Sequence, residues 1–197
     1  MLKIALTGGI ATGKSYVLDQ FRRRGVPCLD ADVLAHGVTA SQTEATSAIA
    51  ARFGAEILAA DGSVDRRKLG PIVFADPSAR RELEAIVHPA VHRAITAGLR
   101  AFELMGDGPF AIVDIPLLFE TGGEKDFAKV IVTACAPEKQ LARLLERGLT
   151  EEAARQRLAA QWPVEKKVAK ADFVVRTDGT FEETNRQAAE IFRILSS

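Results

Sequence analysis

The chain has 197 residues, 47% of them hydrophobic and 26% charged, and its 26 basic and 26 acidic side chains give a formal net charge of zero. Such a composition excludes global disorder, which needs low hydrophobicity and high net charge, and the 15 glycines lack the fixed period of a collagen-like chain. Balanced charge argues against a dedicated nucleic-acid or membrane-surface binder, so we expect neither partner.

Several features of the sequence bear on the cellular compartment of the protein. No stretch reaches the roughly 18 apolar residues of a membrane span. The amino terminus has no basic region followed by a long apolar stretch, so we expect no signal peptide. Cys28 and Cys135 lie in apolar runs and are interpreted as buried, reduced thiols. Together these features predict a cytoplasmic protein, and because nothing suggests an extended interface, we expect a monomer.

Apolar runs alternate with longer amphipathic segments along the chain. The runs are nearly continuous, which is typical of strands covered on both faces, and the alternation predicts an α/β fold with a parallel sheet flanked by helices. Strands are predicted over residues 2–6, 26–29, 110–113, 130–133 and 173–175, and helices over residues 14–24, 44–53, 78–86, 89–104, 137–147, 151–161 and 181–195.

Two regions interrupt this alternation. Residues 31–109 are mostly helical in pattern and far exceed an ordinary crossover, which needs only a dozen or more residues, so we predict a helical insertion that holds a substrate. Residues 139–170 contain eight basic and four acidic side chains. Their basic excess fits either a surface that faces anionic ligand groups or a solvated helical face, and charge alone does not decide between them.

A glycine-rich motif follows the first predicted strand and opens the first predicted helix. In such a P-loop, successive backbone N–H groups point at phosphate oxygens, and the helix N-terminus adds partial positive charge. The lysine reaches the β- and γ-phosphates, and the hydroxyl after it ligates Mg²⁺. The motif therefore predicts a bound nucleoside triphosphate. Its residues are Gly8, Gly9, Ile10, Ala11, Thr12, Gly13, Lys14 and Ser15.

Acidic residues follow the second and third predicted strands. Ligands of open α/β sheets bind beyond the carboxyl ends of the strands, so these acids are expected near the phosphates. Asp32 is the favoured base for an alcohol acceptor. Asp30 could fill the same role, or it could instead cap the helix that follows. Asp114 resembles a Walker B acid that holds Mg²⁺, or it is a strand-end turn residue.

With these motifs in place, the chain resembles the dephospho-CoA kinase family over nearly its full length. The short elements are individually weak, but their order and combination are specific. They are residues 6–15 (LTGGIATGKS), 30–32 (DAD), 53–54 (FG), 61–69 (DGSVDRRKL), 88–89 (HP), 116–120 (PLLFE), 140–147 (QLARLLER), 161 (Q) and 171–172 (AD).

The resemblance implies transfer of the ATP γ-phosphoryl group to the ribose 3′-hydroxyl of dephospho-CoA, the last step of CoA biosynthesis, with Mg²⁺. It implies a P-loop-type nucleotide-binding core over residues 1–30, 110–138 and 171–197, a CoA-binding insertion over 31–109 and a lid over 139–170. Arg143 and Arg147 would join Lys14 and Asp32 as catalytic residues, and Tyr16 would join the nucleotide-binding loop. The implied substrate-binding residues are Asp30, Asp32, Arg66, His88, Pro116 and Leu117.

Departures from the family pattern fall around the nucleotide. Ala11 and Thr12 replace the usual Gly-Ser, Tyr16 replaces the usual Thr, and residues 176–178 (RTD) stand where the family usually has Asn. Two other classes of protein share parts of this pattern. A nucleoside monophosphate kinase would share the P-loop and lid but would hold its acceptor differently. A nucleotide-dependent switch would not need a carboxylate for an alcohol, and no N-K-x-D guanine motif follows the fourth strand.

Overall fold

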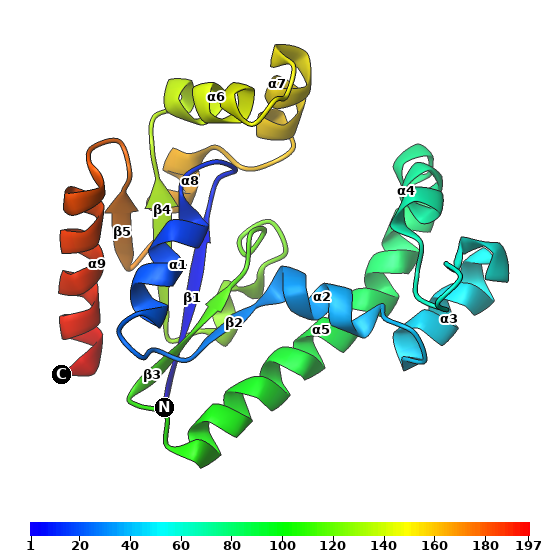
Figure 1. The fold of residues 1–197 in the computed structure, drawn as a ribbon, viewed down its shortest axis with the longest axis horizontal. Helices are drawn as coiled ribbons and strands as arrows, with labels where there is room; N and C mark the ends of the chain where they lie inside the picture. Colours follow the sequence, from blue (N-terminus) through cyan, green and yellow to red (C-terminus); the bar gives the residue numbers. More distant parts are fainter. The chain divides into compact units, whose positions relative to one another are not determined.

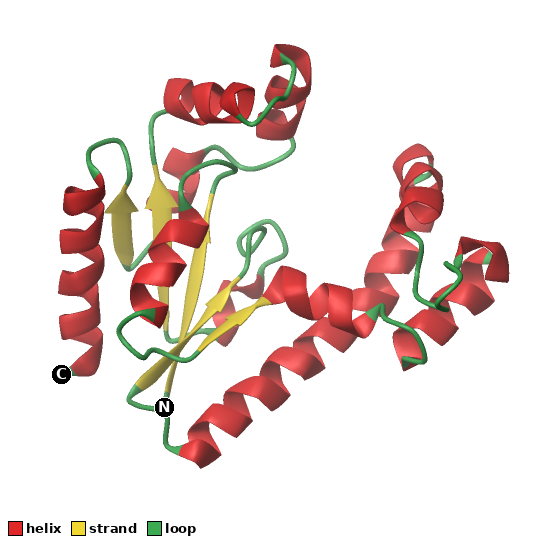
Figure 2. Cartoon of the chain, in the orientation of Figure 1, coloured by secondary structure: helices red, strands yellow, loops and turns green.

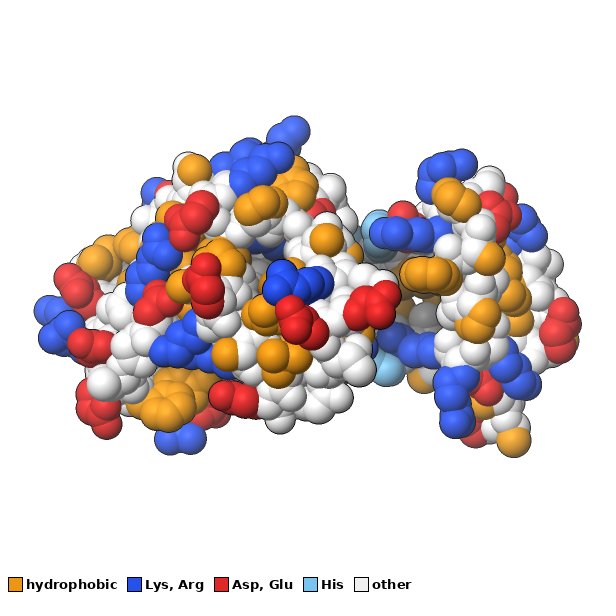
Figure 3. Space-filling model, turned by 90° about the horizontal axis from the view of Figure 1, so that it is seen from above, with side chains coloured by type: hydrophobic (Ala, Val, Ile, Leu, Met, Phe, Trp, Pro, Cys, Tyr) orange, Lys and Arg blue, Asp and Glu red, His pale blue; other side chains and the backbone are white.

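The computed structural model describes residues 1–197 and divides the chain into two compact units (Figure 1). The core unit comprises Met1–Leu29 and Ala101–Ser197, and the helical unit comprises Asp30–Arg100. No helix combines the length and the apolar content that crossing a membrane requires. On the face drawn in Figure 3, basic and acidic side chains are interspersed over both units, in keeping with the balanced composition.

A five-stranded sheet with the order β2-β3-β1-β4-β5 forms the centre of the core unit. The neighbours β1–β3, β1–β4 and β4–β5 pair in parallel, which confirms the predicted α/β fold. Since parallel strands all end at the same edge, the loops after β1, β3, β4 and β5 leave the sheet on one side. The strands are β1 (Leu2–Gly8), β2 (Cys28–Asp30), β3 (Phe110–Asp114), β4 (Lys129–Ala134) and β5 (Phe173–Arg176).

Both faces of this sheet are covered (Figure 2). Ile4 and Leu6 of β1 belong to one apolar cluster, in which α1 (Lys14–Arg22) and α9 (Phe181–Ser196) pack. Ala5, between them in sequence, belongs to a second cluster with Leu118, Phe119 and Trp162. Successive strand side chains point to opposite faces, so a strand buried on both sides must be apolar at every position.

The remaining helices of the core unit follow β4. They are α6 (Pro137–Glu146), α7 (Glu151–Ala159) and α8 (Val164–Val168), and the short 3-10 helix η2 (Gly123–Asp126) precedes β4. Local sequence explains several of their starts. Pro137 occupies the first turn of α6, Thr150 caps α7, and Thr180 and Glu183 form a capping box at the start of α9.

The helical unit contains α2 (Ala31–Val38), α3 (Glu44–Phe53), η1 (Ala55–Ile57), α4 (Arg66–Ala75) and most of α5 (Pro77–Met105). It has its own apolar core around Ile49, Ile57, Val64 and Leu69. Side chains of α5 pack against this core, among them Leu83, Ile86 and Val87. An independent core is what allows this insertion to fold as a compact unit.

The helix boundaries correct two predictions. Residues 78–86 and 89–104 were predicted as separate helices, with His88 and Pro89 opening the second, but they form one 29-residue helix with Pro89 inside it. Proline in a helix interior typically costs about 3 kcal/mol, and packing on both sides of Pro89 offsets this cost, since Val87 packs in the helical core and Ile95 is buried. The helices α2, α4 and α8 were missed.

Candidate active site

The loop between β1 and α1 has the curled backbone that its sequence predicts. Gly13 has a φ of 82°, and Ala11 has a φ of 60°, a left-handed conformation that is uncommon for a residue with a Cβ. A Cβ on Gly8 would overlap Thr133, and one on Gly9 would overlap Gln140 and Val164. No side chain caps the N-terminus of α1 after Gly13, so its first amides keep their donors for an anion.

Lys14 and Asp114 form an ion pair at the carboxyl edge of the sheet. Asp114 ends β3 and is 3% exposed, whereas Ser15 is exposed at the start of α1. The Asp114 carboxylate therefore lies beside the P-loop lysine, although the strand containing it begins about a hundred residues later. Parallel pairing of β1 with β3, in which Leu6 aligns with Asp114, produces this proximity.

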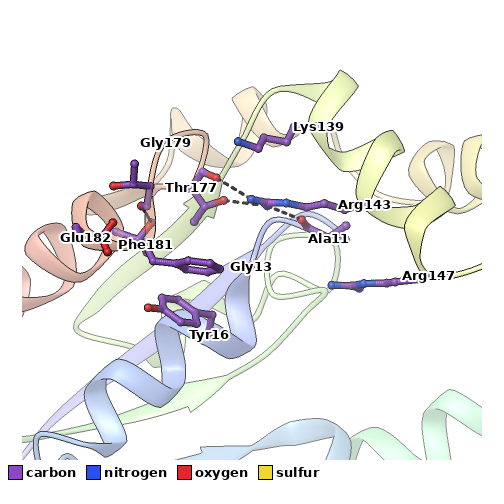
Figure 4. Close-up of a pocket in the computed structure, with 12 residues that line it drawn as sticks. Ala11, Gly13, Tyr16, Lys139, Arg143, Arg147, Thr177, Gly179, Phe181 and Glu182 are labelled. Atoms are coloured by element: carbon purple, nitrogen blue, oxygen red, sulfur yellow. Dashed lines mark hydrogen bonds between the residues drawn. The ribbon is translucent and has the colours of Figure 1, made fainter.

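Arg143 of α6 joins three segments in Figure 4. Its guanidinium donates to the carbonyl of Ala11 at 2.9 Å, to Oγ1 of Thr177 at 3.1 Å and to the carbonyl of Thr177 at 2.8 Å. The Thr177 hydroxyl donates in turn to the carbonyl of Thr12 at 2.8 Å. Arg143 therefore fastens the P-loop to the loop between β5 and α9. Arg147, one helical turn further on, extends along the wall of the same pocket in Figure 4.

A pocket of about 500 Å³ lies beside this network. The rings of Tyr16 and Phe181 face each other with their centroids 4.8 Å apart (Figure 4). The Tyr16 hydroxyl donates to Oδ1 of Asn185 at 2.9 Å, which fixes the ring. The volume and the mixture of aromatic and cationic walls suit a nucleoside with an attached phosphate chain. Its lining includes Ala11, Gly13, Tyr16, Lys139, Arg143, Arg147, Thr177 and Phe181.

The helices after β4 also pack directly on the P-loop. Gln140 donates from Nε2 to the carbonyl of Ile10 at 2.6 Å, and Oε1 of Gln161 accepts the Ile10 amide at 2.8 Å. The Ile10 N–H is therefore already bonded, and the Thr12 N–H donates to the Gly9 carbonyl at 3.3 Å. Thr12 is also unavailable through its hydroxyl, which is buried between Gly9 and Thr133.

A buried ion pair lies on the other side of the P-loop. Lys167 of α8 is completely buried and bonds Oε1 of Glu120 at 2.8 Å. Burial alone raises the pKa of Glu120, but hydrogen bonds from Lys167 and from the Trp162 amide outweigh it and hold that pKa below its usual value. Trp162, interpreted from sequence as a helix end with base stacking as a weaker option, stacks on Phe119 with ring centroids 6.4 Å apart.

The helical unit contains the remaining predicted residues. Asp30 caps α2 by accepting the amides of Asp32 and Val33, so its capping reading is confirmed. Asp32 lies in the first turn of α2 with its side chain exposed. Arg66 reaches from α4 to the Ala35 carbonyl at 3.3 Å.

His88 is exposed within α5, and in the core unit Pro116 is half-buried and Leu117 39% exposed. Sequence reasoning missed Phe181 and Lys167 as parts of the site, whereas residues 176–178 were expected near the nucleotide. A signal existed for Lys167, because Val164, Lys167 and Val168 follow i, i+3, i+4 spacing and so share a helix face.

A P-loop with a paired lysine and strand-end acid, on a parallel sheet with helices packed over the loop, is an arrangement that P-loop kinases share with other P-loop nucleotide-binding proteins. A family model described as dephospho-CoA kinase matches residues 2–183, and the chain belongs to that family. The family catalyses the last step of CoA biosynthesis, the ATP-dependent phosphorylation of dephospho-CoA, which confirms the predicted activity.

Individual relatives agree over nearly the whole chain. It is 46% identical to the dephospho-CoA kinase of Geobacillus kaustophilus (strain HTA426) over 193 residues, covering 98% of this chain and 96% of the relative. A crystal structure from Thermus thermophilus is similar with a TM-score of 0.85 and 34% identity, covering 100% of this chain and 98% of that one. The structure of the dephospho-CoA kinase from Campylobacter jejuni is similar with a TM-score of 0.75 and 28% identity, covering 98% of this chain and 96% of that one.

Proposed function

We propose that the P-loop binds the ATP triphosphate through Lys14 and the amides at the start of α1. The observation that carries this proposal is the Lys14–Asp114 pair beside an uncapped helix N-terminus. An arriving phosphate competes with Asp114 for the lysine, and the helix N-terminus favours the added negative charge. The shape of the loop depends on Gly8, Gly9, Ala11 and Gly13. The contribution of Ile10 and Thr12 is structural, because their contacts with Gln140, Gln161 and Thr133 hold the loop in place.

The adenosine part of ATP fits the pocket between the P-loop and the start of α9. Tyr16 and Phe181 offer aromatic surface for a base, which prefers offset or tilted ring contacts. Lys139 and Arg147 line the same pocket and supply positive charge toward the phosphate chain. Arg143 already makes four hydrogen bonds, three to oxygen atoms of Ala11 and Thr177 and one to Sγ of Cys135, so its role is to hold the pocket together as well as to add charge.

Mg²⁺ is the metal that this site suits. In nucleotide sites Mg²⁺ keeps several waters and binds one or two protein oxygens together with the phosphates. Ser15, exposed at the helix start, and Asp114, at the strand end, are such a set of oxygen donors. When bound there, the ion would neutralise charge on the β- and γ-phosphates. No group of three or more acidic, His or Cys side chains is arranged so that it could hold a metal ion.

Asp32 acts as the base toward the ribose hydroxyl of dephospho-CoA. Its carboxylate is exposed in the first turn of α2, whereas Asp30 uses Oδ1 for the helix cap and keeps only Oδ2 for a substrate contact. Phosphoryl transfer to an alcohol uses a carboxylate that orients the hydroxyl and accepts its proton. The further substrate contacts that we propose are Asp30, Arg66, His88, Pro116 and Leu117.

Residues 31–109 form the CoA-binding part, residues 139–170 the lid, and residues 1–30, 110–138 and 171–197 the nucleotide-binding core. A lid that closes over the phosphates excludes water and brings its basic side chains to the transferring group. We further propose that the enzyme works as a monomer in the cytoplasm.

An ADP-release assay with Mg·ATP tests this proposal. ADP release that depends on dephospho-CoA, with CoA as the phosphorylated product identified by mass spectrometry, is the expected result. Replacing dephospho-CoA with nucleoside monophosphates is the control for the rival kinase class. Release that a nucleoside monophosphate supports and dephospho-CoA does not would contradict the acceptor assignment. Nucleotide binding without turnover of any acceptor would favour a switch protein instead.

A further inference from the structure

Lys167 is the one lysine whose side chain is completely buried, at 0% exposure. Lysine is almost never fully buried unless it is paired, because removing an ammonium group from water is costly. Replacing a buried ion pair by well-packed hydrophobic residues is often neutral or stabilising, so this pair needs an explanation beyond stability.

All three donors of the Lys167 ammonium have acceptors. Nζ lies 2.8 Å from Oε1 of Glu120 and 3.3 Å from each of the carbonyl oxygens of Gly8 and Pro116. An ammonium group has three N–H donors and no acceptor, so these contacts use its full capacity. Lys167 therefore has no donor left for a substrate, and its role is exerted through the groups it holds.

Those groups belong to segments that the reaction uses. Gly8 ends β1 and opens the P-loop, Pro116 follows β3, and Glu120 lies in the same segment between β3 and η2. Oε1 of Glu120 also accepts the amide of Trp162 at 3.0 Å, which ties in the chain that leads back from α7. Oε2 of Glu120 is buried with no hydrogen-bond partner, so the carboxylate's position is set by Oε1 alone.

The contact with Gly8 has a consequence for the phosphate loop. Peptide groups are planar, and the carbonyl and the N–H of a trans peptide point in opposite directions. The Gly8 carbonyl shares its plane with the amide of Gly9, so holding the carbonyl also fixes the direction of that N–H. Gly9 has no room for a Cβ, because Gln140 and Val164 lie against it. By holding the Gly8 carbonyl, Lys167 therefore fixes the orientation of the Gly9 N–H, the first amide of the P-loop.

We propose that the Lys167–Glu120 pair is a positioning device that orients the start of the P-loop and holds it to the post-β3 segment and the chain returning from α7. Electrostatic preorganisation requires donors that are fixed before the reaction begins. Lys167 is then a positioning residue for ATP. Through its bond to the Pro116 carbonyl it also positions one of the proposed contacts of dephospho-CoA. This inference rests on the proposed function for its effect on turnover, but its effect on ATP binding stands independently.

Three variants test the proposal. Lys167→Met removes the charge and keeps a stem of similar length. Lys167→Met combined with Glu120→Gln removes both charges, so no unpaired buried carboxylate remains, while Gln keeps an oxygen for the Trp162 amide. Lys125→Met is the matched control, because Lys125 is exposed in η2, close in sequence to Glu120, and takes no part in the contacts of Lys167.

Thermal unfolding, ATP affinity by calorimetry without acceptor, and kcat and KM for each substrate are measured on all of them. Acrylamide quenching of Trp162, the single tryptophan, reports the order of the chain after α7. We expect the double variant to unfold nearer to wild type than Lys167→Met does. ATP affinity and kcat should nevertheless stay at least tenfold lower in both, with stronger quenching of Trp162. Lys125→Met should match the wild type in every measurement.

A folded double variant whose ATP affinity and kcat lie within twofold of wild type would overturn the proposal and leave the pair a structural feature. If Lys167→Met does not fold, the double variant decides alone, and if it also fails, Glu120→Gln decides by the same criteria. Wild-type enzyme without dephospho-CoA-dependent ADP release would refute the proposed function instead. In that case the ATP affinities of the variants still decide whether Lys167 positions the P-loop.

Discussion

Removing the Arg143 guanidinium should destabilise the core unit strongly. Arg143→Met keeps most of the aliphatic stem but loses the bonds to Ala11 at 2.9 Å and to Thr177 at 3.1 and 2.8 Å. A hydrogen bond to a charged group contributes about 1.5–3 kcal/mol, and bonds that share one guanidinium are not additive. We therefore expect a loss of about 2–4 kcal/mol in the free energy of unfolding.

Thermal unfolding followed by far-UV circular dichroism measures this loss. At about 2–4 °C per kcal/mol for a chain of this size, the midpoint should fall by roughly 4–16 °C. Arg147→Met is the matched control, since Arg147 is exposed on the same helix, and its midpoint should change by less than about 2 °C. Equal midpoints for the two variants would refute the argument that Arg143 fastens the P-loop to the loop after β5.

Three further results are expected. Lys14→Met should keep the fold and lower turnover at saturating ATP by about two to three decades, because one preorganised charged contact to the phosphates is lost. A loss of initial rate smaller than about tenfold would contradict the role of Lys14. Burial raises the pKa of Cys28 to about 11, so its alkylation by iodoacetamide at pH 8 should be about two orders of magnitude slower than that of a free thiol, and an ordinary rate would show the thiol to be accessible. The pKa of Asp172 lies below its usual 3.8, because bonds from Lys129 and the Val130 amide outweigh the effect of burial. Its stabilising contribution is therefore present above that value and is lost as the pH falls through the folded pKa. The urea midpoint of wild type should decline toward pH 3 more steeply than that of Asp172→Asn, and parallel curves would contradict this assignment.

Local patterns explain what the sequence could predict. The P-loop is a continuous motif between a strand and a helix, so its backbone follows from its own residues, and the five apolar runs became the five strands. The continuity of α5 through Pro89 was not predictable, because proline normally ends a helix and only packing along both halves overrides that preference. Helix α4 contains Gly70 and Pro71, which obscure its pattern in the same way.

The contacts of the site depend on tertiary structure instead. Lys14 meets Asp114 because β3 pairs beside β1, an order that the alternation of strands and helices does not specify. The role of Arg143 at the phosphates stays a prediction, and its observed bonds to Thr177 require β5 to end beside α6. A motif therefore indicated which residues matter, and the strand order determined what each of them touches.

The most direct test of the proposed phosphoryl transfer compares the rate of CoA formation by Asp32→Asn with that by Glu44→Gln. Both variants remove an exposed carboxylate from the helical unit, and Glu44, 95% exposed, has only a 3.7 Å contact with Arg93. With Mg·ATP and dephospho-CoA, Asp32→Asn should keep its ATP affinity and lose about two to three decades of CoA formation, whereas Glu44→Gln should behave as wild type. Near-normal CoA formation by Asp32→Asn would contradict the account, because the acceptor hydroxyl would then lose its proton without that carboxylate.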